Sequence, residues 1–285
     1  MGLLNQVLAT EKRYRLTKTF RPNDFFLSLR ELVRRHELVW LMTVRHLKGQ
    51  YKQSVLGYAW AFVNPLTQML ILSFVFSIFL QVRPAGDVPY PLFLFVGLLP
   101  WIFFSSAVAS GTDSVVGASS LVTKVYFPRE ILPIAAAFTK VVDLAFGLLI
   151  LTAMMIYYGT PPEWTVVWVP AIFLIHLVFT IGLSFPLAAL NLFFHDVRFL
   201  VGVVLSMWFY LTPVMYPVET VPPRYHILFD LNPNSIIINA YRRVIYQGDS
   251  PGLDRLLLGL GVAVVTFVVG YYLFKMMEGA FADRI

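Results

Sequence analysis

Long apolar runs alternate with short polar segments along most of the 285-residue chain. Crossing about 30 Å of hydrocarbon takes about 20 helical residues at about 1.5 Å each, and six uncharged or nearly uncharged runs reach or approach that length. They cover residues 55–80, 90–111, 131–158, 166–192, 199–216 and 256–274. The pattern predicts an all-α integral membrane fold with six transmembrane helices, in a domain over residues 55–285.

Residues 1–54 are polar and basic and form a separate N-terminal segment. In NDFFLSLRELVRRHELVWLMTVRHLK (23–48), apolar residues recur every three or four positions, and Arg and Lys occupy much of the rest. This period indicates an amphipathic helix over about 24–48, which we expect to lie in the membrane interface because a span follows closely. The alternative is an ordinary helix packed on a soluble partner. No signal-peptide core precedes the first run, so we expect that run to remain as a span.

The segment between the fifth and sixth runs is too long for a hairpin and is rich in proline. Its stretch YHILFDLNPNSIIINAYRRVIY is nevertheless apolar enough to meet the membrane again. Proline and asparagine break helices into short pieces. We therefore expect two short re-entrant or interfacial helices within residues 211–254 on the external side, and a folded external loop is the alternative.

The placement of charge predicts the orientation. Only 13% of residues are charged, against about 25% in soluble domains. Eleven of the 22 Lys and Arg lie in residues 1–54, and charges in the loops continue this bias, with sixteen on the side of the termini and five on the other. Cytoplasmic segments are richer in Lys and Arg, so both termini are expected in the cytoplasm. This bias accounts for the net charge of +6 without a nucleic-acid partner.

Few residues could carry chemistry inside the spans. Lys140 and Asp143 are three apart on the third run and share one helical face. A structural ion pair is the favoured interpretation, because an unpaired charge in a bilayer is costly; a proton relay or substrate site is the alternative. His176 is alone in the fourth run, and we expect it to pack. Without cysteine the chain has no thiolate zinc site or disulfide, and no metal site is expected.

Aromatic residues make up 16% of the chain. Most are expected in interface belts or against lipid, but aromatic rings also stack on sugars, so some could line a path for a glycan. The candidates for that path are Tyr58, Trp60, Phe62, Trp208, Tyr210 and Tyr216. The chain has no GxxxxGK[ST] phosphate loop, HExxH, GxSxG or dinucleotide motif. We therefore expect no catalytic site, and a pump built on this chain would need a separate ATPase subunit.

Several blocks resemble one known family. They are YKQSVLGYAWAFVNPL (51–66), YPLFLFVGLLPWIFFSSAV (90–108), SLVTKVYFPREILP (120–133), DVRFLVGVVLSMWFYLTPVMYP (196–217) and LNPNSIIINAYR (231–242). In order and spacing they are similar to the membrane subunit of type-2 ATP-binding-cassette exporters of polysaccharide, the group that exports O-antigens, capsules and teichoic acids. The resemblance implies a homodimer in the bacterial plasma (inner) membrane, bound to two copies of a cytoplasmic ATPase that holds ATP and Mg. The substrate it implies is a glycan linked to undecaprenyl diphosphate.

The resemblance also implies roles for particular residues. The loop over 119–130 would be a coupling helix seated in a cleft of the ATPase. The residues that would contact the ATPase or hold this helix in place are Leu121, Lys124, Val125, Tyr126, Phe127, Pro128, Arg129 and Glu130. The segment 218–250 would form an external gate. Arg45, Lys48, Lys52, Leu56 and Gly57 would lie at a cytoplasmic portal for the lipid diphosphate, since phosphate favours clustered Lys and Arg. The alternative for the basic residues is a flank that only sets orientation.

Two rival functions remain. An ATP-driven exporter of a lipid or drug would have the same architecture. An integral-membrane glycosyl or phosphoglycosyl transferase would need carboxylates and cations clustered at one face. The wide separation of Asp113, Asp143 and Asp196 along the chain argues against the transferase.

Overall fold

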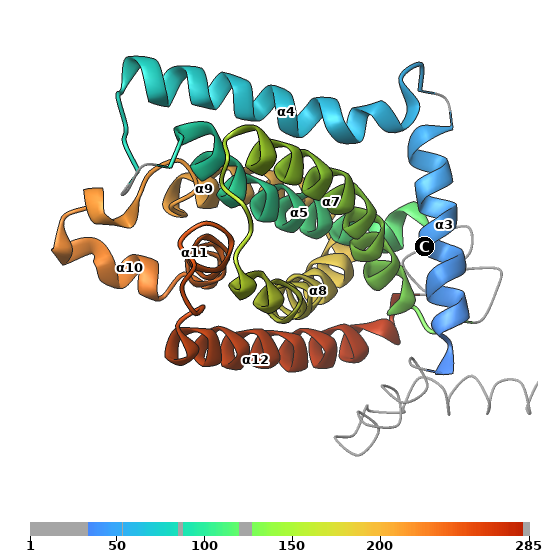
Figure 1. Cartoon of the computed structure of the whole chain (residues 1–285). Coiled ribbons are helices and arrows are strands. Elements are labelled where there is room, and N and C mark those ends of the chain that lie inside the picture. Colours follow the sequence, from blue (N-terminus) through green and yellow to red (C-terminus); the bar gives the residue numbers. More distant parts are fainter. Residues whose placement is uncertain (1–33, 53, 85–87, 120–126, 282–285) are drawn as a thin grey trace, which may run out of the picture.

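The computed structural model describes residues 34–52, 54–84, 88–119 and 127–281 (Figure 1). Every regular element in those ranges is helical, so the predicted all-α fold is confirmed. In chain order the elements are α3 (His36–Tyr51), the 3₁₀ turn η1 (Gly57–Ala59), α4 (Trp60–Ser73), the π-helical turn η2 (Phe74–Phe79), α5 (Tyr90–Gly117), α7 (Ile131–Tyr157), η3 (Trp164–Trp168), α8 (Val169–Phe193), α9 (Val197–Leu211), η4 (Val218–Thr220), η5 (Pro223–Tyr225), α10 (His226–Asp230), α11 (Pro233–Ile245) and α12 (Leu253–Glu278).

Within the part of the chain that the structure describes, five helical stretches are long and apolar enough to cross a membrane. They are Gly57–Phe79, Tyr90–Gly117, Ile131–Tyr157, Trp164–Phe193 and Leu253–Glu278. The fifth predicted run forms α9, which has 15 residues and is therefore only about 22 Å long. It ends at Leu211 because Pro213 has no amide hydrogen and disfavours a helical residue before it. The apolar run therefore extends five residues beyond the helix that it forms.

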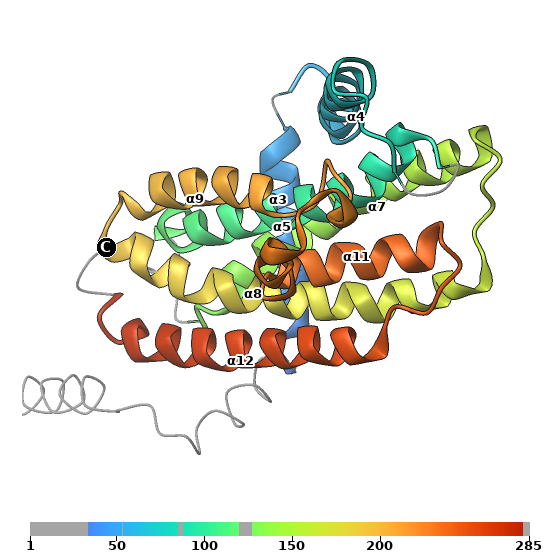
Figure 2. The ribbon, with the colours of Figure 1, turned by 90° about the vertical axis from the view of Figure 1, so that its left-hand side faces the viewer.

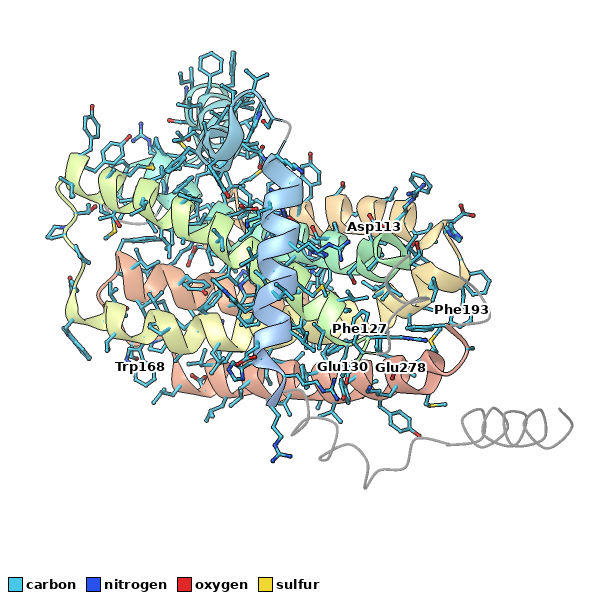
Figure 3. The ribbon with its side chains drawn as sticks, turned by 90° about the vertical axis from the view of Figure 1, so that its right-hand side faces the viewer. Asp113, Phe127, Glu130, Trp168, Phe193 and Glu278 are labelled. Carbon is cyan, nitrogen blue, oxygen red and sulfur yellow. The ribbon has the colours of Figure 1, made fainter. Side chains whose placement is uncertain are left out.

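Helix α5 lies at the centre of the bundle. It packs against α7 and α8, and also against α4, α9 and α11. Figures 1 and 2 show α4 and α12 on opposite sides of this central group. Helix α3 crosses one end of the bundle and packs against α7 (Figure 3). The core thus belongs mainly to α5, α7 and α8, whereas α9 keeps most of its apolar side chains on the outside and α4 exposes several of them.

Small residues bring α8 and α12 into close contact. A Cβ added to Gly182 would lie 2.6 Å from the Cα of Phe267, and one added to Gly270 would overlap the carbonyl of Gly182. No larger residue fits at either position without moving the helices apart. Such contacts between backbones are a common basis of helix association in membranes, where there is no hydrophobic force between helices.

The proline-rich segment contains α10 and α11, and α11 enters the bundle. Ten of its 13 residues are buried, and it packs against α5, α8 and α12. The helix begins at Pro233, directly after Asn232, whose Oδ1 accepts a hydrogen bond from the Asn234 amide at 3.1 Å. An asparagine N-cap followed by proline is a strong helix start. Asn232 and Pro233 therefore determine where the chain turns into the bundle.

Candidate functional site

Three adjoining cavities run along one face of the bundle, and we call them together the polar groove. The first, of about 360 Å³, lies between α3, α4, α5 and α7. The second, of about 330 Å³, shares Gln50 and Lys140 with it and extends along α3. The third, of about 290 Å³, shares Asn64, Ile102 and Ser106 with the first and extends to α9. The shared residues make the three cavities one continuous surface.

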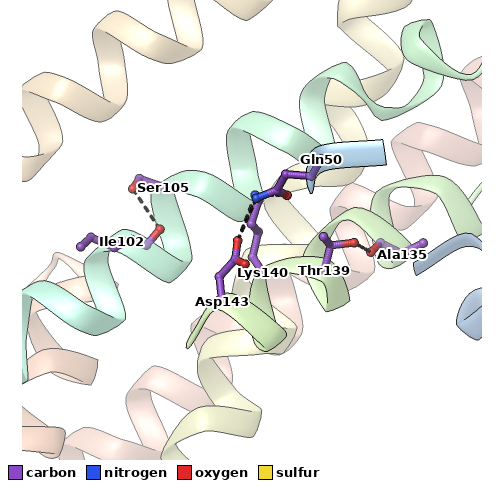
Figure 4. A network of polar contacts seen from close by, with 7 residues as sticks. All are labelled: Gln50, Ile102, Ser105, Ala135, Thr139, Lys140 and Asp143. Atoms are coloured by element: carbon purple, nitrogen blue, oxygen red, sulfur yellow. Dashed lines mark hydrogen bonds and ion pairs between the residues drawn. The ribbon is translucent and has the colours of Figure 1, made fainter. Parts of the chain in front are cut away.

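A small polar network joins α3 to α7 in this groove (Figure 4). Lys140 Nζ lies 3.2 Å from Asp143 Oδ2 and donates to Gln50 Oε1 at 2.9 Å. Gln50 Nε2 in turn donates to Asp143 at 3.5 Å. The three-residue spacing on α7 brings the two charges together, but only the fold brings Gln50, 90 positions away from Lys140, between them. The network therefore holds α3 against the bundle.

The proposed portal residues lie on and after α3. Arg45 lines the second cavity together with His46 and Lys140. The pKa of His46 is lowered, mainly because the side chain is partly buried and to a lesser extent because Arg45 and Lys140 are positively charged. Lys48 and Lys52 are exposed nearby, at the end of α3.

The chain then turns at Leu56 and Gly57. Leu56 is exposed, and Gly57 has a φ of +51°, a left-handed conformation that glycine adopts at little cost. Of the proposed portal residues, the structure thus places only Arg45 on the groove.

The middle of the groove is lined by uncharged polar side chains. Asn64 and Gln68 lie 7 and 11 residues into the Gly57–Phe79 stretch, about 10 and 17 Å along it. Ser105 and Ser106 of α5 and Ser206 of α9 lie opposite. Polar groups facing hydrocarbon cost free energy, so a polar stripe at this depth indicates a surface that faces water or substrate.

The sequence interpretation missed this stripe. Gln68 Nε2 donates to Asn64 Oδ1 at 3.1 Å, which reflects their i,i+4 spacing. That spacing of two amides inside an apolar run was the signal available in the sequence. The serines gave a weaker one, because they often bond to their own helix, as Ser105 Oγ does to the Trp101 carbonyl at 2.9 Å.

The predicted path aromatics separate into two groups. Trp60 and Tyr210 line the polar groove, and Tyr58 is half exposed near the same end of α4. The others pack against protein. The ring of Phe62 lies 5.0 Å from that of Phe146, the Trp208 indole N–H donates to Asn232, and the Tyr216 hydroxyl donates to the Tyr210 carbonyl.

A buried arginine satisfies the broken backbone after α9. Arg242 Nη1 and Nη2 donate to the carbonyls of Pro213 and Val214 at 2.6 and 2.7 Å, and the guanidinium lies 3.8 Å from the centre of the Phe93 ring. The Tyr90 hydroxyl donates to the next carbonyl, that of Met215, at 2.7 Å. Irregular backbone at membrane depth needs such internal partners. The charge pattern of the sequence places Arg242 in the external loops, whereas the structure buries it.

The predicted coupling segment is described only at its end. Leu121, Lys124, Val125 and Tyr126 lie outside the described residues. Phe127 packs against a core cluster formed by α5, α7, α8 and α12, and Pro128 is half-buried. Arg129 Nη1 donates to the Glu278 carbonyl at 2.9 Å and its guanidinium lies 5.5 Å from the centre of the Phe281 ring. This part of the segment is thus joined to the end of α12.

Glu130 strengthens that junction. It is 2% exposed, and Lys275 Nζ lies 2.8 Å from its Oε2 and 2.9 Å from Glu278 Oε2. The Tyr271 hydroxyl donates to the other Glu130 oxygen at 3.3 Å. Figure 3 shows Glu130 and Glu278 side by side at the end of the bundle. An ion cluster therefore connects the start of α7 to the last turn of α12.

Two other polar residues noted in the sequence, His176 and Asp113, make contacts within the bundle. His176 is buried and stacks on Phe104, with 5.9 Å between ring centres. Asp113 is exposed and accepts a hydrogen bond from Asn191 at 3.1 Å. These contacts fit packing and helix joining.

Comparison with known proteins gives one consistent family. Residues 37–246 match the model of the ABC-2 type transporter. The chain is 33% identical over 260 residues to the O-antigen export system permease protein RfbA of Myxococcus xanthus, covering 90% of this chain and 98% of that protein. It is 28% identical to the Klebsiella pneumoniae protein of the same name, over 87% of this chain and 94% of the relative. It is 22% identical to the polysialic acid transport protein KpsM of Escherichia coli, over 86% and 93%.

Proposed function

Because the chain belongs to the ABC-2 type transporter family, we propose that it is the permease subunit of an ATP-driven exporter that moves a polysaccharide across the bacterial plasma membrane. The observation that carries the proposal is the polar groove, which presents amides and hydroxyls at mid-membrane depth. The names of the relatives, O-antigen export permease and polysialic acid transport protein, support a glycan over a lipid or drug.

The groove is open on one side, and this supports a homodimer. Asn64, Gln68 and Ser206 are exposed on the single chain, although they would be unfavourable against lipid. A second copy facing α4 and α9 would enclose them in a shared path. In this arrangement α9 and the turn that follows it form the sixth membrane-spanning element, α10 and α11 form the re-entrant external gate, and both termini are cytoplasmic.

ATP hydrolysis belongs to a separate cytoplasmic subunit, of which two copies bind the dimer. The coupling segment 119–130 contacts that subunit, and its end transmits the movement through Arg129 and Glu130 to α12. Helix α3 lies in the membrane interface, next to that ATPase subunit. Its network with Lys140 and Asp143 would make the bundle respond when α3 moves.

The lipid carrier would enter beside α3. Arg45 and Lys140 line the same cavity, and Lys48 and Lys52 are exposed close by. Clustered cations suit a diphosphate, so we place the diphosphate of a polyprenyl-linked glycan there. Its sugars would continue along Trp60 and Asn64 into the middle of the groove.

Reconstitution tests the proposed function. The chain would be co-expressed with an ATP-binding-cassette ATPase from the same genome, and the purified complex reconstituted in proteoliposomes with a polyprenyl-diphosphate glycan. We expect a complex with two copies of each subunit, and an ATP hydrolysis rate that rises when the glycan is added. A chain that stays monomeric, binds no ATPase or shows no response to the glycan would refute the proposal.

A further inference from the structure

The third cavity of the polar groove, at the α9 end, is lined by no carboxylate, amine or guanidinium side chain. In the third cavity, whose lining lies wholly within the described residues, the polar side chains carry amides, hydroxyls and an indole N–H, from Asn64, Gln68, Trp101, Ser105, Ser106, Ser206 and Tyr210. The charged residues Lys140 and Asp143 lie in the first cavity, towards α3, and are paired with each other. The middle of the groove is therefore polar but electrically neutral.

These groups suit the surface of an uncharged sugar. The bond from Gln68 Nε2 to Asn64 Oδ1 leaves amide donors and acceptors for sugar hydroxyls. Ser206 Oγ gives its proton to the Gly202 carbonyl at 2.9 Å, so its oxygen can accept one. The rings of Phe209 and Tyr210 flank the same cavity and offer apolar faces for the C–H faces of a sugar ring.

A polyanionic glycan would meet no compensation there. Each repeat would bring a carboxylate or phosphate to mid-membrane depth, where an uncompensated charge is strongly disfavoured. A second copy of the chain would contribute the same uncharged set by symmetry. The diphosphate of the carrier crosses only once, whereas charges on the repeats would occupy the path throughout export.

We therefore infer that the groove selects glycans without charge on their repeating units. The inference rests on the proposed function and narrows its substrate class. The physical basis is the combination of hydroxyl-binding amides, ring faces and the absence of any cation along the lining of the third cavity.

The test compares two polymers of equal length on the same polyprenyl diphosphate. One consists of neutral hexoses and the other carries a uronic acid in every repeat. Each is produced in cells that lack their own exporter and express this chain with its ATPase, and surface polymer is measured over time. We expect the neutral glycan to appear at the surface at least about tenfold faster. A single uncompensated charge in the middle of the membrane is enough to slow passage by about that factor or more. Equal rates, or faster export of the acidic glycan, would overturn the inference while leaving the proposed function intact.

If neither polymer reaches the surface although the complex is assembled in the membrane, the proposed function itself fails. A pair of variants of similar size refines the test. Gln68→Lys should shift the ratio of acidic to neutral export upwards several-fold, and Gln68→Glu should shift it downwards. Ser206→Lys replaces Gln68→Lys if the latter does not accumulate. An unchanged ratio in the lysine and glutamate variants would overturn the inference.

Discussion

The Lys275→Met substitution tests the ion cluster at the end of α12. Lys275 is 12% exposed in its side chain and donates to Glu130 and Glu278 at 2.8 and 2.9 Å. Methionine keeps the length of the side chain but leaves the Glu130 carboxylate, 2% exposed, without its cation. Removing one partner of a buried ion pair costs about 3–5 kcal/mol. At roughly 2–4 °C per kcal/mol for a large domain, we expect the unfolding midpoint to fall by about 6–20 °C.

The assay is thermal unfolding of the purified chain in lipid nanodiscs, followed by loss of the monodisperse peak. Glu278→Gln is the matched control, because Glu278 is more exposed than Glu130, and its loss should cost about 1 kcal/mol or less. Adding Glu130→Gln to Lys275→Met should recover part of the loss, since the unpaired charge is then removed. A Lys275→Met chain as stable as the wild type would show that Lys275 does not stabilise Glu130. The same conclusion would follow if the double variant lost as much stability as the Lys275→Met and Glu130→Gln single variants lose together.

Three further predictions concern other parts of the bundle. Arg242→Met should destabilise the chain by about 3 kcal/mol or more, because the carbonyls of Pro213 and Val214 lose charged donors; hydrogen exchange over 211–218 would rise, and unchanged protection there would contradict the assignment. Gly270→Val should separate α12 from α8 and abolish a disulfide engineered across that contact, whereas the same change at Gly261, which has open space, should not. Because burial lowers the pKa of His46, the unfolded state takes up its proton first as pH falls below 6.5, so the docking of α3 should weaken there; exchange measured on α3 should lose that pH dependence in His46→Gln.

The helical fold could be predicted because a membrane-spanning helix needs a certain length and an apolar composition, and each apolar run in the sequence shows both. The end of α9 was harder, since Leu211 and Tyr216 belong to one apolar run and only Pro213 marks the break. A hydropathy average over the run does not detect Pro213, although this single proline ends the helix. The predicted pairing partners Lys140 and Asp143 lie within one helix, so their 3.2 Å contact follows from local geometry.

Contacts between distant segments could not be predicted in this way. Glu130 and Lys275 are 145 positions apart, and no pattern in either segment refers to the other. The same holds for Arg242, which appears in the sequence as one of two adjacent loop arginines but turns inward on α11. Its buried position depends on Asn232 and Pro233, which start that helix at the right place.

The contacts of Arg242 also determine an order of assembly. The carbonyls of Pro213 and Val214 leave the ribosome 28 or 29 residues before the guanidinium that binds them. Until α11 has been synthesised and folded back into the bundle, the end of α9 has no arginine to satisfy it. We therefore expect the turn after α9 to become stable only when α11 has folded back into the bundle, so that α9 and α11 are stabilised together.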